Sequence, residues 1–359
     1  MSETGGAEAA VPSAVRRALT GVGRRVRTLR SWTRSLITIL RANPLTLFGF
    51  VLVLLISVTA FLLVVTPPIT QSLLGHPVRL TPHDPNELFL PCPVIGNETV
   101  CAQPPSAEHL FGTDRTGRDV FSRVLAALPL DLAIGFSVAG ISLILGGLLG
   151  LVAGFWDTPG TIGGLVSASI LRVTDIFLAF PSLVLALAIA ATLGRGTVPS
   201  VLAILVTWWP FYVRLARGEV LAVKHQPYVI AARAAGVSET KILTRHVFRN
   251  ILEPLVVYFT MDVGTVLVVF STISFIGIGV PPDTPEWGAM IESYGDFLLR
   301  YPWMVIAPGL AIFLTVLAFS LLGDGLRDIL DPRSRRALTQ VATPAAALVA
   351  SGAPVRTEA

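Results

Sequence analysis

The sequence predicts an all-α integral membrane protein with six transmembrane helices and both termini in the cytoplasm. Of its 359 residues, 53% are hydrophobic and only 14% are charged, and several apolar runs approach twenty residues. A bilayer core takes about 20 apolar residues per helix, so this composition excludes a single soluble core. Arg and Lys gather in alternate connecting segments, the distribution that sets orientation in a membrane.

Six apolar runs are long enough to span a bilayer. They cover about residues 45–66, 129–155, 170–193, 197–216, 254–276 and 303–323. Pro67 and Pro68 are expected to end the first run, because proline removes a backbone donor from a helix. The polar residues 1–43 do not fit a cleavable signal peptide and are expected to form a basic cytoplasmic tail. Residues 334–359, rich in Ala, Thr and Pro, are expected to be disordered.

Charge orients these spans. The N-terminal tail carries eight Arg against two acids, and the connection between spans four and five carries seven basic residues against three acids. By contrast, residues 277–302 hold four acids and a single Arg. The sequence pI of about 9.4 therefore reflects membrane topology, and no nucleic-acid partner is expected. The Arg-rich stretch before span one is either an interfacial helix on the inner leaflet or a loosely ordered tail.

The polar stretch 226–254 between two apolar spans predicts a short helix, a glycine turn and an amphipathic helix on the cytoplasmic side. Pro227 suits a first helical turn, Gly236 suits a left-handed C-terminal position, and Ser238 is expected to cap the next helix. An apolar stripe at helical spacing follows, made of Ile242, Leu243, Val247, Phe248 and Ile251. This stretch either folds onto its own spans or docks a cytoplasmic partner.

Several long blocks identify a family. In chain order they are "RANPLTLFGF" (41–50), "HLFGTDRTGRDVFSRVL" (109–125), "RVTDIFLAFPSLVLALA" (172–188), "WWPFYVRLARGEVLAV" (208–223), "ISFIGIGVPPDTPEWGAMI" (273–291) and "PWMVIAPGLAIFLTVLAFSLLGDGLRDILDPR" (302–333). They resemble the C-type permease subunit of ABC importers for dipeptides, oligopeptides and nickel. The resemblance implies a type I ABC-importer permease fold, with the first helix and an extracytoplasmic loop in 44–128 and the transmembrane core in 129–333.

The resemblance also implies partners. A homologous second permease subunit, two cytoplasmic ATPase subunits and an extracytoplasmic solute-binding protein would assemble with this chain in the lipid membrane. No segment fits the phosphate-binding pattern G-x-x-x-x-G-K-[ST], so ATP and Mg²⁺ are expected on the ATPase subunits. The chain is then expected to hold no cofactor, metal or catalytic residue of its own. Peptides are the expected cargo, with an oligosaccharide or a nickel chelate as alternatives.

The stretch 226–254 resembles the family's coupling loop, whose pattern is Glu-Ala-Ala, three residues, Gly, nine residues, then Ile-x-Leu-Pro. Ala231, Ala232 and Gly236 match, whereas Ile230 stands in place of the Glu and Arg249 in place of the Pro. The residues expected to couple to the ATPase are Tyr228, Ala231, Ala232, Arg233, Gly236, Ser238, Ile242 and Arg245.

Charged and polar residues in the spans suggest a pathway or internal pairing. Asp262, Phe270 and Ser274 are candidates for the translocation pathway, with Asp262 equally able to pair with another helix. Phe270 stands where many relatives have Glu. Arg172 and Asp175 are expected to pair locally.

Further expectations concern the extracytoplasmic side. Asp131 is expected to lie near enough to the outer interface to be solvated. Cys92 and Cys101 form either a disulfide or two unrelated thiols. The segment "GTDRTGRDVFSR" (112–123) forms either a self-satisfying salt-bridge turn or a contact for the binding protein.

Two other function classes would require different sequence features. An ion-coupled secondary transporter would need internal repeats and charge pairs at mid-membrane, and the sequence offers one deep acid. A membrane-embedded enzyme would need His, Asp or Glu clustered at one membrane face, and the five His are scattered along the sequence.

Overall fold

The computed structural model describes residues 44–330, except 75, 89–93, 96, 97, 100 and 282. Two expectations, the basic tail 1–43 and the disordered tail 334–359, lie outside this part of the chain. The described residues form helices and one small hairpin, made of β1 (Val94–Ile95) and β2 (Glu98–Thr99) paired antiparallel, with Val94 opposite Thr99. The all-α membrane prediction is confirmed by this architecture.

The helices follow the apolar pattern closely. They are α2 (Pro44–Leu74), α3 (Val120–Phe155), α4 (Ile162–Leu178), α5 (Ser182–Leu193), α6 (Thr197–Lys224), α7 (Pro227–Ala234), α8 (Glu239–Ile242), α9 (Phe248–Phe275), α10 (Trp287–Tyr294) and α11 (Trp303–Leu330). A π-helical turn, Leu243–Val247, joins α8 to α9, and a 3₁₀ turn, Gly295–Phe297, follows α10. Five helices of the described chain are long and apolar enough to cross a membrane.

The sixth span is present only as a bent pair. Helices α4 and α5 meet at 84°, so the expectation of one continuous helix over 170–193 was wrong. The break lies at Pro181, which occupies the N-cap of α5. Proline disfavours helical backbone at the residue before it, and this is the physical reason for the bend. Counting the pair as one span gives the six that the sequence predicted.

The first helix is longer than predicted. It continues through Pro67 and Pro68 to Leu74 instead of ending at the prolines. Two missing backbone donors remove two hydrogen bonds from the helix, but an apolar segment in lipid has no better alternative to helical backbone. The prediction that these prolines end the helix was therefore wrong.

A glycine ridge sets the closest helix packing. Gly146, Gly150 and Gly154 recur every four residues and so share one face of α3, which lies against α6. A Cβ on Gly150 would come within 2.5 Å of the Val213 carbonyl oxygen and 2.7 Å of the Ala216 Cβ. Small residues at this spacing let two helix backbones approach closely in a membrane, so α3 and α6 pack backbone against backbone along this ridge.

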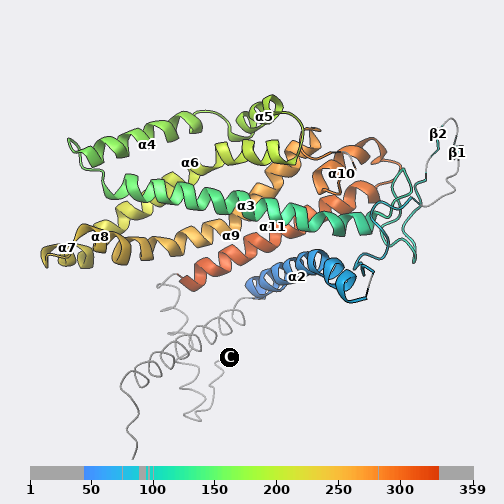
Figure 1. Cartoon of the computed structure of the whole chain (residues 1–359), viewed down its shortest axis with the longest axis horizontal. Helices are drawn as coiled ribbons and strands as arrows, with labels where there is room; N and C mark the ends of the chain where they lie inside the picture. The colour runs from blue at the N-terminus through green and yellow to red at the C-terminus, as the bar shows by residue number, and fades with distance from the viewer. Residues whose placement is uncertain are drawn as a thin grey trace, which may run out of the picture. The chain divides into compact units, whose positions relative to one another are not determined.

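The two ends of the bundle carry different elements (Figure 1). Helices α7 and α8 lie at one end, together with the connection from α3 to α4. Helix α10 and the loops before α3 lie at the other end. Segments predicted to be cytoplasmic thus gather at one end and those predicted to be extracytoplasmic at the opposite end, as alternating spans require.

Candidate functional site

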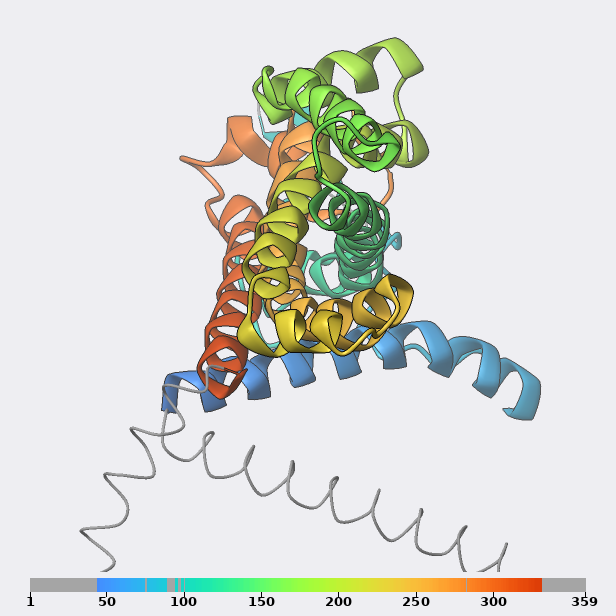
Figure 2. The same cartoon turned by 90° about the vertical axis from the view of Figure 1, so that its left-hand side faces the viewer.

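The coupling segment, defined as Gln226–Pro254, lies across the end of the bundle. Viewed from that end, α7 and α8 cross in front of the long helices (Figure 2). Four apolar side chains anchor it from below: Val229, Ile242, Val247 and Ile251 are each at most 1% exposed. The stripe predicted from the sequence therefore packs onto the chain's own spans, except that Phe248 is 38% exposed.

A Schellman motif closes α7. The backbone N–H of Val237 donates to the Ala232 carbonyl at 3.1 Å, and that of Gly236 donates to the Arg233 carbonyl at 3.0 Å. These two bonds require a left-handed residue between them, and Gly236 supplies it with φ +76°. The predicted glycine turn is confirmed, and it holds α7 and α8 at a defined angle.

An ion pair bridges the same turn. The Arg233 guanidinium donates to both carboxylate oxygens of Glu239, from Nε at 2.8 Å and from Nη2 at 3.1 Å. Both side chains are about half exposed, so the bridge stiffens the surface but contributes little to global stability.

The eight predicted coupling residues divide into two groups. Tyr228, Ala231, Arg233, Gly236, Ser238 and Arg245 are exposed, and Ala232 is half-buried against the core. Ile242 is 0% exposed, so it supports the surface from within. Ser238 occupies the N-cap of α8, but its side chain makes no capping hydrogen bond, and the capping prediction was wrong in that respect.

Ion pairs near the same end differ from those predicted. Asp175 accepts a hydrogen bond from Nη2 of Arg214 on α6 at 2.8 Å, rather than pairing with Arg172. Lys224 at the end of α6 pairs with Asp157 and also donates to the Gly154 carbonyl at 3.0 Å. The Lys224 contacts tie the α3–α4 connection to α6, and the Arg214 pair ties α4 to α6. Spacing along α4 favoured Arg172 as the partner of Asp175, but a basic side chain of the neighbouring helix takes that place.

At the opposite end, Asp114 organises a polar turn. Its Oδ1 accepts from the Thr116 N–H and hydroxyl and from the Arg118 N–H. Its Oδ2 accepts from Arg118 Nε and from the Tyr294 hydroxyl, both at 2.9 Å. Burial alone would raise the pKa of the Asp114 carboxyl, but these hydrogen bonds and the Arg118 charge lower it overall. Within the described residues, these contacts favour the self-satisfying salt-bridge turn over a contact reserved for the binding protein.

Two buried acids hold the start of α10, one as its cap and one from α3. The Glu286 carboxylate accepts from the Gly288 and Ala289 N–H groups at 2.9 and 2.7 Å and so caps α10. Asp131 accepts from the Trp287 N–H at 3.3 Å and is 1% exposed, so the expectation that it is solvated was wrong. Burial raises the pKa of the Glu286 carboxyl.

The deep acid is satisfied inside the subunit. Asp262 on α9 accepts from Nε1 of Trp208 at 2.9 Å and from the Tyr212 hydroxyl at 2.8 Å. Asp262, Phe270 and Ser274, the three pathway candidates, are at most 4% exposed. Of the two readings of Asp262, these contacts favour pairing with another helix, namely α6. The sequence could not show this, because Trp208 and Tyr212 lie some fifty positions away.

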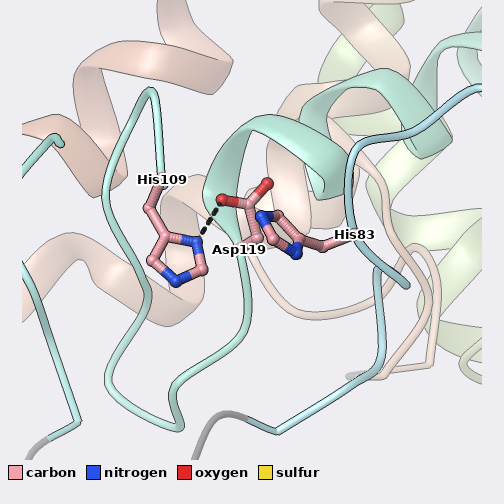
Figure 3. A group of neighbouring side chains, drawn as sticks. All are labelled: His83, His109 and Asp119. Atoms are coloured by element: carbon pink, nitrogen blue, oxygen red, sulfur yellow. Dashed lines mark hydrogen bonds and ion pairs between the residues drawn. The ribbon is translucent and has the colours of Figure 1, made fainter. Parts of the chain in front are cut away.

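Three side chains from separate parts of the connection between α2 and α3 meet beside the start of α3 (Figure 3). They are His83, His109 and Asp119, and His109 Nδ1 donates to Asp119 Oδ1 at 2.9 Å. No local sequence pattern predicts this cluster, because its two histidines lie well apart along the chain. Nearby, Cys101 is disulfide-bonded, and Cys92, the partner considered from the sequence, lies outside the described residues.

Comparison with known proteins shows which family the chain belongs to. Residues 146–336 match the family model "Binding-protein-dependent transport system inner membrane component". The probable D,D-dipeptide transport system permease protein DdpC of Escherichia coli K12 is 38% identical over 299 residues, covering 83% of this chain and 91% of DdpC.

Two further relatives are named for different cargoes. The di/tripeptide permease protein DppC of Pseudomonas aeruginosa UCBPP-PA14 is 42% identical over 264 residues, covering 72% of this chain and 82% of DppC. The glutathione permease protein GsiD of Escherichia coli O6:K15:H31 is 43% identical over 233 residues, covering 64% and 74% of the two chains.

Among solved structures, the inward-facing MetNI methionine ABC transporter aligns with a TM-score of 0.49 at 17% identity, covering 58% of this chain and 97% of the other. Permeases of the matched family are not catalytic themselves and carry no cofactor of their own. This chain belongs to the binding-protein-dependent transport system inner membrane component family, as a multi-pass inner-membrane permease subunit of an ABC importer in the branch that includes peptide and glutathione permeases.

Proposed function

We propose that this subunit forms half of a translocation pathway for short peptides and that the coupling segment transmits motion from a cytoplasmic ATPase. The observation that carries the coupling proposal is the geometry of residues 226–254. A Schellman turn sets the angle between α7 and α8, and a buried apolar underside fixes the segment to the bundle, while its outer face stays exposed. A rigid element with an exposed face is suited to transmit a push from a partner.

The exposed face indicates how the ATPase would bind. Tyr228 and Ile230 are 45% and 53% exposed, and Ala231 and Ala234 beside them are small. An amphipathic helix with large anchors next to small residues fits into an apolar groove. Because Ile230 stands where the family pattern has Glu, α7 would bind the groove of the ATPase subunit mainly through shape and apolar contact.

Short peptides are the cargo supported best. Relatives named for D,D-dipeptides and for di/tripeptides match over 83% and 72% of this chain. Glutathione, for which another relative is named, is itself a modified tripeptide, so both names describe ligands with a peptide bond and free charged ends. The second permease subunit would be a homologue of this chain, because half a pathway needs a complementary half.

The test is uptake into proteoliposomes that contain the assembled importer and its binding protein. We expect ATP-dependent uptake of labelled dipeptides, with no uptake when the ATPase subunits carry a substitution that blocks hydrolysis. Glutathione, an oligosaccharide and a nickel chelate serve as competitors. Uptake that persists without hydrolysis would refute the ATP-driven reading, and competition by the oligosaccharide but not by peptides would refute the cargo proposal.

Coupling is tested separately, with Ala232→Glu. Ala232 is half-buried against the core, so a carboxylate there would disturb the underside of the segment. We expect ATPase activity that no longer accelerates with loaded binding protein, in a subunit that still inserts in the membrane. Unchanged coupling in this variant would argue against docking at residues 226–254.

A further inference from the structure

Three side chains with metal-binding chemistry converge on the extracytoplasmic end of the bundle. His83 comes from the long loop after α2, His109 from the loop before α3, and Asp119 from the N-cap of α3. One ring nitrogen of each histidine and one carboxylate oxygen of Asp119 lie within 4.8 Å of one another. The two imidazole rings also pack together, with their centroids 4.8 Å apart.

We propose that His83, His109 and Asp119 form a binding site for one divalent transition-metal ion of the zinc class. Two imidazole nitrogens and one carboxylate oxygen suit Zn²⁺ and its neighbours in the first transition row, whereas Mg²⁺ and Ca²⁺ prefer oxygen ligands alone. Three protein ligands leave a fourth position of a tetrahedral ion for water or for a group of a docked partner.

Two of the three ligands, Asp119 and His83, are held by a further contact. The other carboxylate oxygen of Asp119 accepts from the Ser122 backbone N–H at 2.7 Å, and the Ser122 hydroxyl accepts from the backbone N–H of His83 at 3.1 Å. Nε2 of His83 lies 3.0 Å from the Glu108 carbonyl oxygen, which accepts its proton. Backbone carbonyls and carboxylates in this outer position orient metal-binding histidines.

Burial favours a site that retains its ion. His109 and Asp119 are 3% and 1% exposed, and His83 is half-buried. Ligand atoms around tetrahedral zinc lie about 3.3 Å apart, given bonds of about 2.0 Å. Small rotations of the two rings would close the present spacing to that value. The proton between His109 and Asp119 would leave to water as the metal takes its place.

A bound ion would join three segments that are otherwise linked by hydrogen bonds. The parts of the α2–α3 connection around His83 and His109 would move as one unit with the N-cap of α3. This unit lies at the end of the bundle predicted to receive the binding protein. Because the ion binds the folded loop and not the unfolded one, it would stabilise this face by mass action.

The experiment uses the full chain in its assembled importer, stripped of metal and titrated with Co²⁺ as a spectroscopic probe for zinc. We expect about one equivalent of Co²⁺ with visible d–d absorption of tetrahedral strength, displaced by Zn²⁺. His83→Gln should weaken this binding at least about tenfold, in line with the cost of losing an outer contact alone. His76→Gln is the matched control, because His76 is an exposed histidine of the same loop, and it should bind as the unsubstituted chain does.

Co²⁺ that binds elsewhere in the assembly contributes equally to His83→Gln and His76→Gln, so it cancels when the two variants are compared. His109→Gln provides a second ligand variant, and gel filtration with ATP-driven uptake checks that each variant is assembled. Absence of the Co²⁺ spectrum in the unsubstituted chain would overturn the proposal. Equal binding by His83→Gln and His76→Gln would overturn it as well, leaving the cluster with a purely hydrogen-bonded role.

Discussion

Replacing Gly236 by Ala should loosen the coupling segment without creating a clash. A Cβ at this position would meet no atom within 4 Å, but the residue has φ +76°. Left-handed backbone costs an L-residue with a side chain about 1–2 kcal/mol. That free energy is lost from the closed state of the Schellman turn, so local opening should become about 5- to 30-fold more frequent. The perturbation is therefore purely one of backbone conformation.

Gly218 on α6 gives a matched control. It is also exposed, and a Cβ there also meets nothing within 4 Å, but its backbone is helical. Ala stabilises a helix interior by roughly 0.5–1 kcal/mol relative to Gly. Replacing Gly by Ala should thus destabilise the local structure at position 236 and stabilise it at position 218.

Hydrogen exchange of residues 227–237, read by mass spectrometry in the assembled importer, is the assay for both variants. Exchange should accelerate about 5- to 30-fold in Gly236→Ala and stay unchanged or slow in Gly218→Ala. Gly236→Asn should lie between Gly and Ala, because Asn tolerates left-handed backbone. If the ratio of peptide uptake to ATP hydrolysis falls in the same order, the turn transmits the push. Equal exchange in the two Ala variants would refute the reasoning.

Three further predictions concern stability, each measured by thermal unfolding in detergent. Asp114→Asn should lower the unfolding free energy by roughly 2 kcal/mol at neutral pH. The folded pKa of the Asp114 carboxyl is lowered from 3.8, so the extra stability of the unsubstituted chain over Asp114→Asn is present above pH 3.8 and is lost as the pH falls through the folded pKa. A stability difference between the two chains that stays constant across pH 3–7 would contradict the charge-based account. Gly150→Ala should destabilise by about 1–3 kcal/mol through overpacking against α6, whereas Gly147→Ala, whose Cβ finds its nearest atom at 3.9 Å, should not, and similar losses in both would argue against the ridge. Asp262→Leu leaves two buried donors without an acceptor and should destabilise by about 2–5 kcal/mol; normal stability with altered uptake would instead favour a pathway role.

The coupling segment shows how far local sequence reasoning reaches. Pro227 and Gly236 act through backbone conformation, which depends on their own residue type, and both occupy the predicted positions. Ser238 does not cap through its side chain, because capping also depends on where the neighbouring N–H groups point. Ile242 lies beneath the surface rather than on it, since helical spacing defines a stripe but not the partner that covers it.

The sequence by itself determined the membrane class, the apolar spans, the family and the glycine turn, because hydropathy and backbone preference are properties of short segments. Only the tertiary structure decided which side chains meet. It broke the third span at Pro181, paired Asp175 with Arg214, and satisfied Asp262 from α6. It also brought His83 and His109 to Asp119. Such contacts join residues tens of positions apart, and their partners are chosen by packing of whole helices and loops, which no local pattern encodes.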